Sequence, residues 1–431
     1  MSQISGRLVS RNYSDFRGVD FSDRKDEVSL YRSPDALNMW KNYKNANGKC
    51  VETRPDIELL AEYNDTIFGL FFYESGGSTH KIVHSGTKLY DEDTVIYTDM
   101  NESKSNFFTF NNILYIKDGK NYLEYNGTTC QSITAYIPTT SISRTPAGGG
   151  KTYEDVNLLT PYRINSFVAD GTSVTYNLDS WIDFDPEHPF DAEQPTAWTY
   201  NANGQKVDLF ISSVGWGGGD ISGAVSFDTA PSAPLTVGKD NVFVKFKHTI
   251  EGSADKVKKS TKLEIFDNRI FFSGNPDEPN ILRHCSLNDP TYVSDLDYYA
   301  EGLNDSEIKS MVSGNNALWV LKEPSQSNTT IFYHNPVIDN DYGKVYPSIH
   351  SSISTGCIAS AINFNDTICF ISDRGLESIT GDVTTEQTLD HRSSLIDSRL
   401  LNEPDLSKII LEEWEGYLLV ISDNHIYLAE R

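Results

Sequence analysis

The sequence predicts an all-β protein, and three observations support this fold class. Phe, Trp and Tyr make up 12% of the 431 residues, and aromatic and β-branched side chains favour strands. Short apolar runs alternate with turns rich in Asn, Asp and Gly, which is typical of β-hairpins. One such hairpin, with the turn Asn365-Asp366 between the apolar runs 359–364 and 367–371, recurs along the chain.

The spacing of these turns predicts propeller blades. The matching turns are Asn64-Asp65, Asn111-Asn112, Asp267-Asn268, Asn315-Asn316, Asn365-Asp366 and Glu415-Gly416. Their successive intervals are 47, 156, 48, 50 and 50 residues, and a hairpin repeat of roughly 40–50 residues is typical of β-propellers. We therefore predict a six-bladed β-propeller, or a seven-bladed one if the long interval hides another blade. Blades 1–2 would occupy residues 57–138, and blades 3–6 residues 257–431.

The long interval predicts an inserted β-sandwich over residues 139–256. Its opening stretch, 139–155, is rich in Ser, Thr and Gly, and we expect a boundary loop there. Strand-like runs then follow at 163–169, 173–178, 206–212, 224–228 and 241–249. In the last run apolar and charged side chains alternate, as in a half-buried strand. Several short strands in about a hundred residues favour a compact two-sheet domain.

Residues 1–56 are expected to form an N-terminal arm. Ser33 suits a helix N-cap, Pro34 the first helical position and Asp35 the first turn, so a short helix is predicted there. A strand is expected at 49–53. The last repeat begins near residue 405 and leaves room for only two or three strands. Because an incomplete blade exposes an unpaired edge, strands of the arm are predicted to close the last blade.

Composition restricts the classes of partner and compartment. No run approaches the roughly 20 apolar residues of a membrane span, and the first residues show no secretory signal, so we expect synthesis in a cytoplasm and no membrane insertion. The formal net charge of −25 disfavours a nucleic-acid-binding surface. The five widely spaced cysteines, without a C-x-x-C motif, predict buried thiols: Cys50, Cys130, Cys285, Cys357 and Cys369.

The sequence motifs predict no enzyme. H-E-x-x-H, G-x-S-x-G and G-x-G-x-x-G are absent, and the run Gly148-Gly149-Gly150-Lys151-Thr152 lacks the glycine that a phosphate loop needs at position 145. We therefore expect no catalytic residue and no cofactor. Asp339 and Asp341 form a partial match to a Ca²⁺ loop, although a solvated acidic loop is the favoured interpretation.

The insert carries a candidate interaction surface. Trp181, Trp198 and Trp216 lie within it, and tryptophans are common where proteins bind sugars or partners. Packing within the sandwich is the alternative interpretation. Trp319 and Trp414 lie in or beside blade hairpins, where packing is the expected role.

Three groups of motifs stand out along the chain. The first group lies in the arm, the second at the entry to the insert, and the third in the third blade. They are Phe16-Arg17-Gly18-Val19-Asp20, Ser33-Pro34-Asp35-Ala36-Leu37-Asn38-Met39 and Glu52-Thr53-Arg54-Pro55; Tyr136-Ile137-Pro138-Thr139, Asn157-Leu158-Leu159-Thr160 and Phe167-Val168-Ala169-Asp170-Gly171; and Phe272-Ser273-Gly274-Asn275-Pro276-Asp277 with Asp289-Pro290-Thr291-Tyr292. Together they resemble tailed-bacteriophage structural proteins, and specifically the tail-hub or tail-nozzle ("stabilisation") proteins of short-tailed phages.

The resemblance implies a non-enzymatic virion protein of the phage tail, assembled in the host cytoplasm. It implies a homo-oligomeric ring, expected to be hexameric, which contacts head–tail connector and tail proteins and surrounds the DNA-exit channel. DNA would pass without specific binding, and the acidic charge would suit a channel wall that repels it. The alternatives are a receptor- or glycan-binding tail module and, less favoured, a propeller hydrolase or lyase acting on glycans.

Overall fold

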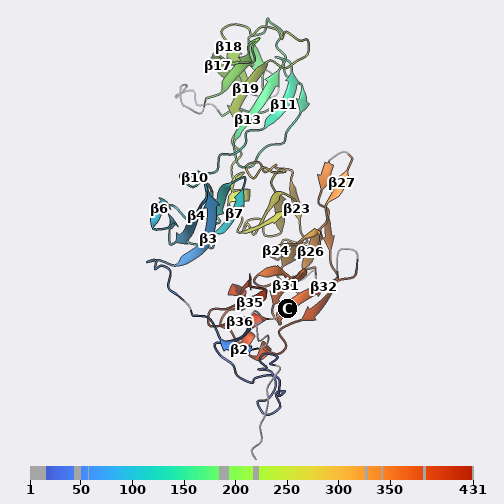
Figure 1. Cartoon of the computed structure of the whole chain (residues 1–431). Helices are drawn as coiled ribbons and strands as arrows, with labels where there is room; N and C mark the ends of the chain where they lie inside the picture. Colours follow the sequence, from blue (N-terminus) through green and yellow to red (C-terminus); the bar gives the residue numbers. More distant parts are fainter. Residues whose placement is uncertain are drawn as a thin grey trace, which may run out of the picture. The chain divides into compact units, whose positions relative to one another are not determined.

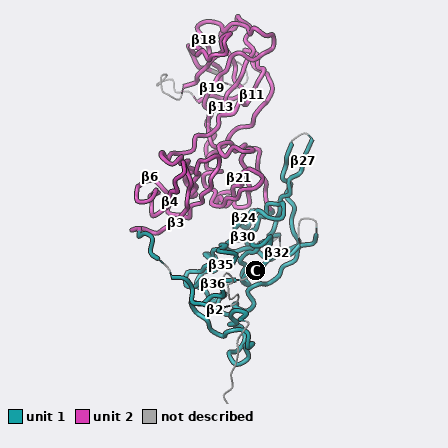
Figure 2. The backbone as a smooth tube through the Cα atoms, in the orientation of Figure 1, with its two compact units in different colours: residues 1–62, 302–431 teal, residues 63–301 magenta. Residues whose placement is uncertain are grey.

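The computed structural model describes residues 16–42, 50–56, 58–183, 194–216, 223–325, 329–340, 343–381 and 385–429. In these residues the chain is almost entirely β-structure (Figure 1). The helices are short: α1 (Asp255–Lys258), α2 (Asp397–Leu400) and the 3-10 helix η1 (Leu406–Lys408). Two compact units form, one from residues 1–62 and 302–431 and the other from residues 63–301 (Figure 2).

The unit of residues 63–301 contains three four-stranded antiparallel sheets. The first is β3 (Ile67–Ser75), β4 (Ser78–Ser85), β5 (Lys88–Asp91) and β6 (Thr94–Tyr97); the second is β7 (Asn106–Phe110), β8 (Ile113–Lys117), β9 (Tyr122–Tyr125) and β10 (Cys130–Ser132); the third is β20 (Lys262–Phe266), β21 (Arg269–Ser273), β22 (Ile281–His284) and β23 (Tyr298–Ala300). Leu89 of the first sheet shares a buried cluster with Leu114 of the second. Tyr122 of the second sheet shares another with Phe272 of the third. Successive sheets therefore pack face to face, as blades do.

The other unit repeats this arrangement. Its first sheet is β24 (Ile308–Gly314), β25 (Ala317–Lys322), β26 (Ile331–His334) and β29 (Ser348–His350), with the side hairpin β27 (Val337–Asp339) and β28 (Gly343–Val345); the next is β30 (Ala361–Phe364), β31 (Thr367–Ser372), β32 (Gly375–Thr380) and β33 (Thr388–His391); the last is β34 (Ile410–Trp414), β35 (Tyr417–Ile421) and β36 (Ile426–Ala429). Trp319 and Phe370 belong to one buried cluster, and Leu376 and Leu418 to another. Consecutive sheets again share their cores.

The hairpin turns agree with the sequence interpretation at most positions. Four Asn or Asp pairs have positive φ at both residues, near +50° and +60°, which is the type I′ geometry that joins twisted strands. They are Asn111-Asn112, Asp267-Asn268, Asn315-Asn316 and Asn365-Asp366. The prediction for Asn64-Asp65 is wrong. This pair precedes β3, and the turn between β3 and β4 is Gly76-Gly77 (φ 59° and 82°).

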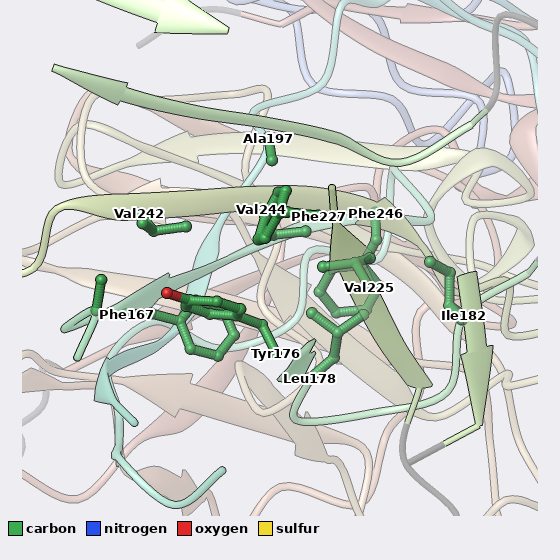
Figure 3. Close-up of a cluster of buried hydrophobic side chains, with 11 residues drawn as sticks. Phe167, Tyr176, Leu178, Ile182, Ala197, Val225, Phe227, Val242, Val244 and Phe246 are labelled. Carbon is green, nitrogen blue, oxygen red and sulfur yellow. The ribbon is translucent and has the colours of Figure 1, made fainter. Parts of the chain in front are cut away.

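The inserted β-sandwich is confirmed. A six-stranded sheet, ordered β12-β11-β13-β19-β15-β16, faces a three-stranded sheet, ordered β14-β18-β17. The strands are β11 (Thr139–Arg144), β12 (Lys151–Thr152), β13 (Tyr162–Phe167), β14 (Thr175–Asn177), β15 (Thr196–Tyr200), β16 (Lys206–Leu209), β17 (Ile211–Trp216), β18 (Gly223–Phe227) and β19 (Val242–Lys247). Phe167, Tyr176, Val225 and Val244 lie in the core between the sheets (Figure 3).

The opening stretch of the insert differs from the prediction. Residues 139–144 were expected in a loop, but they form β11, which pairs in parallel with β13 through two register shifts. The Ser- and Thr-rich sequence of β11 shows no alternation of apolar residues. Its strand conformation depends on backbone pairing to a distant segment, which local sequence patterns do not report.

The N-terminal arm also differs from the prediction. No helix forms at residues 34–38; Asn38 takes a left-handed φ of 57° and turns the extended chain into β1 (Met39–Asn42). β1 pairs with β2 (Cys50–Thr53). Residues 1–15 of the arm lie outside the described residues.

The described arm strands do not extend the last sheet. β1 and β2 form their own two-stranded sheet because each satisfies the other's backbone groups. They contact the last sheet through side chains instead: the Trp40 ring lies 5.3 Å from the Trp414 ring, and the Tyr417 hydroxyl donates to the Lys41 carbonyl at 2.6 Å. The all-β fold of blade-like sheets is thus confirmed, whereas the number of blades and the closure of a ring stay predictions.

Candidate interaction surface

The structure places Trp198 and Trp216 in different sheets of the sandwich. Trp198 lies in β15 of the six-stranded sheet. Trp216 lies in β17 of the other sheet, paired with Gly223, and its side chain is outside the described residues. Trp181 is 44% exposed, and its carbonyl lies 3.0 Å from Nδ1 of His248, just beyond the end of β19. Because the Trp216 side chain is outside the described residues, the three-tryptophan surface stays a prediction.

Trp198 instead belongs to a set of aromatic residues on the outer face of the six-stranded sheet. It pairs directly with Phe243 of β19, and the two rings stack with centroids 5.7 Å apart and planes 13° from parallel. Tyr200, two residues along β15 and therefore on the same face, meets Phe243 edge-on at 5.5 Å. Ala197 and Val244 point to the opposite face and lie in the core.

Two lysines flank these rings. Lys206 Nζ lies 4.4 Å from the centre of the Trp198 ring, and Lys245 Nζ lies 5.2 Å from the centre of the Tyr162 ring. Tyr162 belongs to β13, which pairs with β19. We name the outward set the aromatic face: Tyr162, Trp198, Tyr200, Phe243, Lys206 and Lys245. It combines half-exposed rings with positive charge on a chain of net charge −25.

Sequence reasoning found only Trp198 of the aromatic face. The alternation of Phe243 and Lys245 with buried Val242 and Val244 was a usable signal, because alternate residues of a strand share a face. β15 was missed, since it pairs into the middle of the sheet from a segment with weak apolar patterning. Without β15, neither Tyr200 nor the contact between Trp198 and Lys206 could be inferred.

A second polar cluster surrounds His391 in the unit of residues 1–62 and 302–431. Its Nε2 lies 2.7 Å from Asp397 Oδ2 and its Nδ1 lies 3.2 Å from Glu377 Oε1. Burial acts to lower the pKa of His391, but the hydrogen bonds and charges of Asp397 and Glu377 raise it overall. Ser393 Oγ donates to Asp397 at 2.6 Å and not to the imidazole, so the nucleophile–base contact of a hydrolytic triad is missing.

The His391 cluster adjoins the docking site of the arm. Phe21 donates its backbone N–H to the Leu395 carbonyl at 2.8 Å, and Ser398 Oγ donates to the Phe21 carbonyl at 2.6 Å. The Arg399 guanidinium lies 3.9 Å from the centre of the Phe21 ring. Asp397, Ser398 and Arg399 all belong to α2. The histidine therefore holds the same short helix that holds the arm.

Lys117 is a buried cation between the second and third sheets. Its Nζ donates to the carbonyls of Val257 at 2.6 Å and Lys258 at 2.9 Å, both in α1. The side chain has no exposure to solvent, and this burial lowers the pKa of Lys117 to about 7. The lysine thereby fixes the point where the chain returns from the insert to the blades.

Metal and thiol chemistry receive little support from the described residues. They contain no group of three or more His, Cys, Asp or Glu side chains placed to hold a metal ion. Asp339 ends β27, while Asp341 lies outside the described residues. Burial raises the pKa of Cys130 and Cys285 to about 12 and that of Cys369 to about 11, which keeps these thiols protonated and unreactive. Cys285, Cys357 and Cys369 are buried free thiols, as predicted, whereas Cys130 is partly exposed and the Cys50 side chain is outside the described residues.

The fold and the aromatic face together define an all-β protein of blade-like sheets, with an inserted β-sandwich that carries the aromatic face. Among the described residues, no helix has the length and apolarity needed to cross a membrane. No family model and no curated protein matches the chain.

Several solved structures are similar at a low level. They include the extracellular domain of BT4673 from B. thetaiotaomicron (13% identity, TM-score 0.30, covering 85% of this chain and 39% of that one). They also include BBS1N in complex with ARL6DN (8%, 0.28, 84% and 91%) and the extracellular domain of BT3049 from B. thetaiotaomicron (10%, 0.27, 85% and 63%). The chain thus spans less than two thirds of the two B. thetaiotaomicron domains. We draw no functional argument from likenesses at these TM-scores.

Proposed function

We propose that the chain is a non-enzymatic structural protein of a bacteriophage tail, a hub or nozzle subunit that assembles into a ring at the DNA-exit channel. The order of its domains carries this proposal: two blade-like sheets, an inserted sandwich, and then further blade-like sheets. That order is the one implied by the sequence resemblance to phage tail proteins. Connector and tail proteins would be its neighbours in the virion.

The charge of the chain adds support. A net charge of −25 would line a channel with negative potential and keep passing DNA from adhering to its wall. The ring is expected to be hexameric, with acidic loops toward the lumen and no specific contacts to DNA. A neutral or basic lumen would contradict this part of the proposal.

Native mass spectrometry of the purified full chain, together with negative-stain microscopy, tests the assembly. Closed rings of a single size are expected at micromolar concentration. Because some tail subunits could close only on a neighbouring protein, proteomics of purified phage particles provides the second readout. A chain that stays monomeric and is absent from particles would refute the proposal.

A receptor- or glycan-binding module is the second candidate function, and the aromatic face favours it. The rings of the aromatic face lie at the surface, where a ligand can reach them. In the blade-like sheets, by contrast, aromatic side chains between two successive sheets are buried. The two functions are compatible, since a ring subunit can display a binding domain outward.

A further inference from the structure

We infer that the aromatic face binds an acidic glycan, an oligosaccharide that carries carboxylate groups. This inference deepens the glycan-binding alternative and rests on it. The shape of the surface suits such a ligand. An antiparallel sheet presents a nearly flat face, and Trp198, Phe243 and Tyr200 form a continuous row of rings across β15 and β19. Tyr200 is 51% exposed.

The chemistry of the exposed rings also suits a sugar. The Trp198 Nε1 atom is buried and has no hydrogen-bond partner in the described part of the chain. The indole is flanked by the Phe243 ring and by Lys206 Nζ, so it offers a ligand its remaining apolar surface and no donor. The apolar C–H faces of sugar rings suit such surfaces, because they bury apolar area and leave the hydroxyl groups at the edges for solvent or polar side chains.

The positive charge of the aromatic face favours an acidic glycan over a neutral one. Lys206 and Lys245 place ammonium groups on strands β16 and β19, on either side of β15. The Lys206 side chain is 55% exposed and forms a solvent-exposed ion pair with Asp208 at 3.7 Å, whose side chain is 85% exposed. Such a pair contributes little, so the ammonium group is available to a ligand. A neutral sugar would offer these cations only hydroxyl oxygens, whereas a carboxylated one would form charge-assisted hydrogen bonds, which are stronger.

The extent of the face indicates an oligosaccharide. The aromatic face spans the four neighbouring strands β13, β19, β15 and β16, three strand spacings or about 14 Å. A single sugar could not contact both lysines and the rings between them. Single-stranded nucleic acid would also combine stacking with cations, but affinity for phosphates comes mainly from clustered Lys and Arg, and the net charge of −25 disfavours a nucleic-acid-binding surface.

Isothermal titration calorimetry on the full chain tests the inference. The probes are oligogalacturonate, the matching neutral galactan oligosaccharide and single-stranded oligothymidine. Oligogalacturonate is expected to bind, with affinity that falls as salt rises, and at least tenfold more tightly than the neutral sugar. Equal binding of both sugars, binding of oligothymidine alone, or no binding of oligogalacturonate would overturn the inference.

Substitutions locate the binding. Trp198→Ala and the double change Lys206→Gln with Lys245→Gln should each weaken oligogalacturonate binding at least tenfold. Trp181→Ala is the matched control, since it removes an exposed tryptophan of the same domain that is not one of the six residues of the aromatic face, and it should change the affinity less than twofold. Tyr200→Ala removes an exposed ring and serves if Trp198→Ala fails to fold. An effect of Trp181→Ala equal to that of the face variants would refute the location. Ring assembly should be unchanged in all of them, so loss of binding and loss of assembly are separate outcomes.

Discussion

The His391 cluster gives a prediction about the attachment of the arm. Both ring nitrogens of His391 face carboxylate oxygens, at 2.7 Å and 3.2 Å, and only the imidazolium can donate from both. His391→Gln removes this charge and leaves Glu377, whose side chain is 1% exposed, with a weaker set of donors. The nearby Arg374, at 3.2 Å from Glu377, compensates in part.

The size of the effect follows from burial. Removing one partner of a fully buried ion pair costs about 3–5 kcal/mol, but the His391 side chain is 33% exposed and solvent screens it, so about 1–3 kcal/mol is expected. For a unit of about 200 residues this corresponds to a midpoint lowered by about 2–12 °C. Thermal melts at pH 6 should show this difference. The exposed His350 is the matched control, and His350→Gln should shift the midpoint by less than 1 °C or so.

The pH dependence identifies the charged form as the cause. The pKa of His391 in the folded chain is raised above its ordinary value of about 6.5. The stabilisation is therefore complete below about pH 6.5 and disappears as the pH rises through the folded pKa. The difference between wild type and His391→Gln should shrink from pH 6 to pH 9, while His391→Arg, which stays charged, should not show this loss.

The same variant should loosen the arm. Hydrogen exchange at the Phe21 amide, which bonds to Leu395, should become faster in His391→Gln at pH 6 and approach the wild-type rate at pH 9 after correction for intrinsic exchange. A difference between the two proteins that stays constant, or grows with pH, would refute the reasoning.

Two further predictions concern stability. Lys117→Met leaves the carbonyls of Val257 and Lys258 without their donor and should cost about 2–4 kcal/mol. Because burial lowers the folded pKa of Lys117 to about 7, the wild type should gain stability relative to the variant as the pH rises from 7 to 10, which urea titrations can measure. A difference in stability that stays constant over this pH range would contradict the expected sign. Asp366→Val forces a β-branched residue to φ 58° and should cost about 1–3 kcal/mol, whereas Asp366→Gly should be nearly neutral; equal losses in urea midpoint would contradict the turn geometry.

Sequence reasoning succeeded where local chemistry determines the structure. Asn315-Asn316 and Asn365-Asp366 adopt the positive φ values that their residue types tolerate, and their spacing located successive sheets. The alternation in β19 likewise predicted a half-buried strand, and alternate residues of β19 are indeed buried.

Sequence reasoning failed where distant contacts decide. The Asn64-Asp65 pair has the same residues as Asn365-Asp366, yet β3, the strand that follows it, pairs with β4 further along the chain, and so the pair joins no hairpin. Ser33-Pro34-Asp35 matches a helix start, but the Ser33 amide bonds to the Gly18 carbonyl, which keeps this part of the arm extended. The aromatic face needed the order of four strands, three of which, β13, β15 and β19, are far apart in the sequence.

The central claim, a ring-forming tail subunit, is tested most directly by two-dimensional class averages of phage particles that contain the chain, imaged with and without an antibody to its inserted sandwich. The proposal predicts a closed ring below the head, with the antibody bound around its circumference. Antibody density elsewhere on the particle, or none at all, would contradict it.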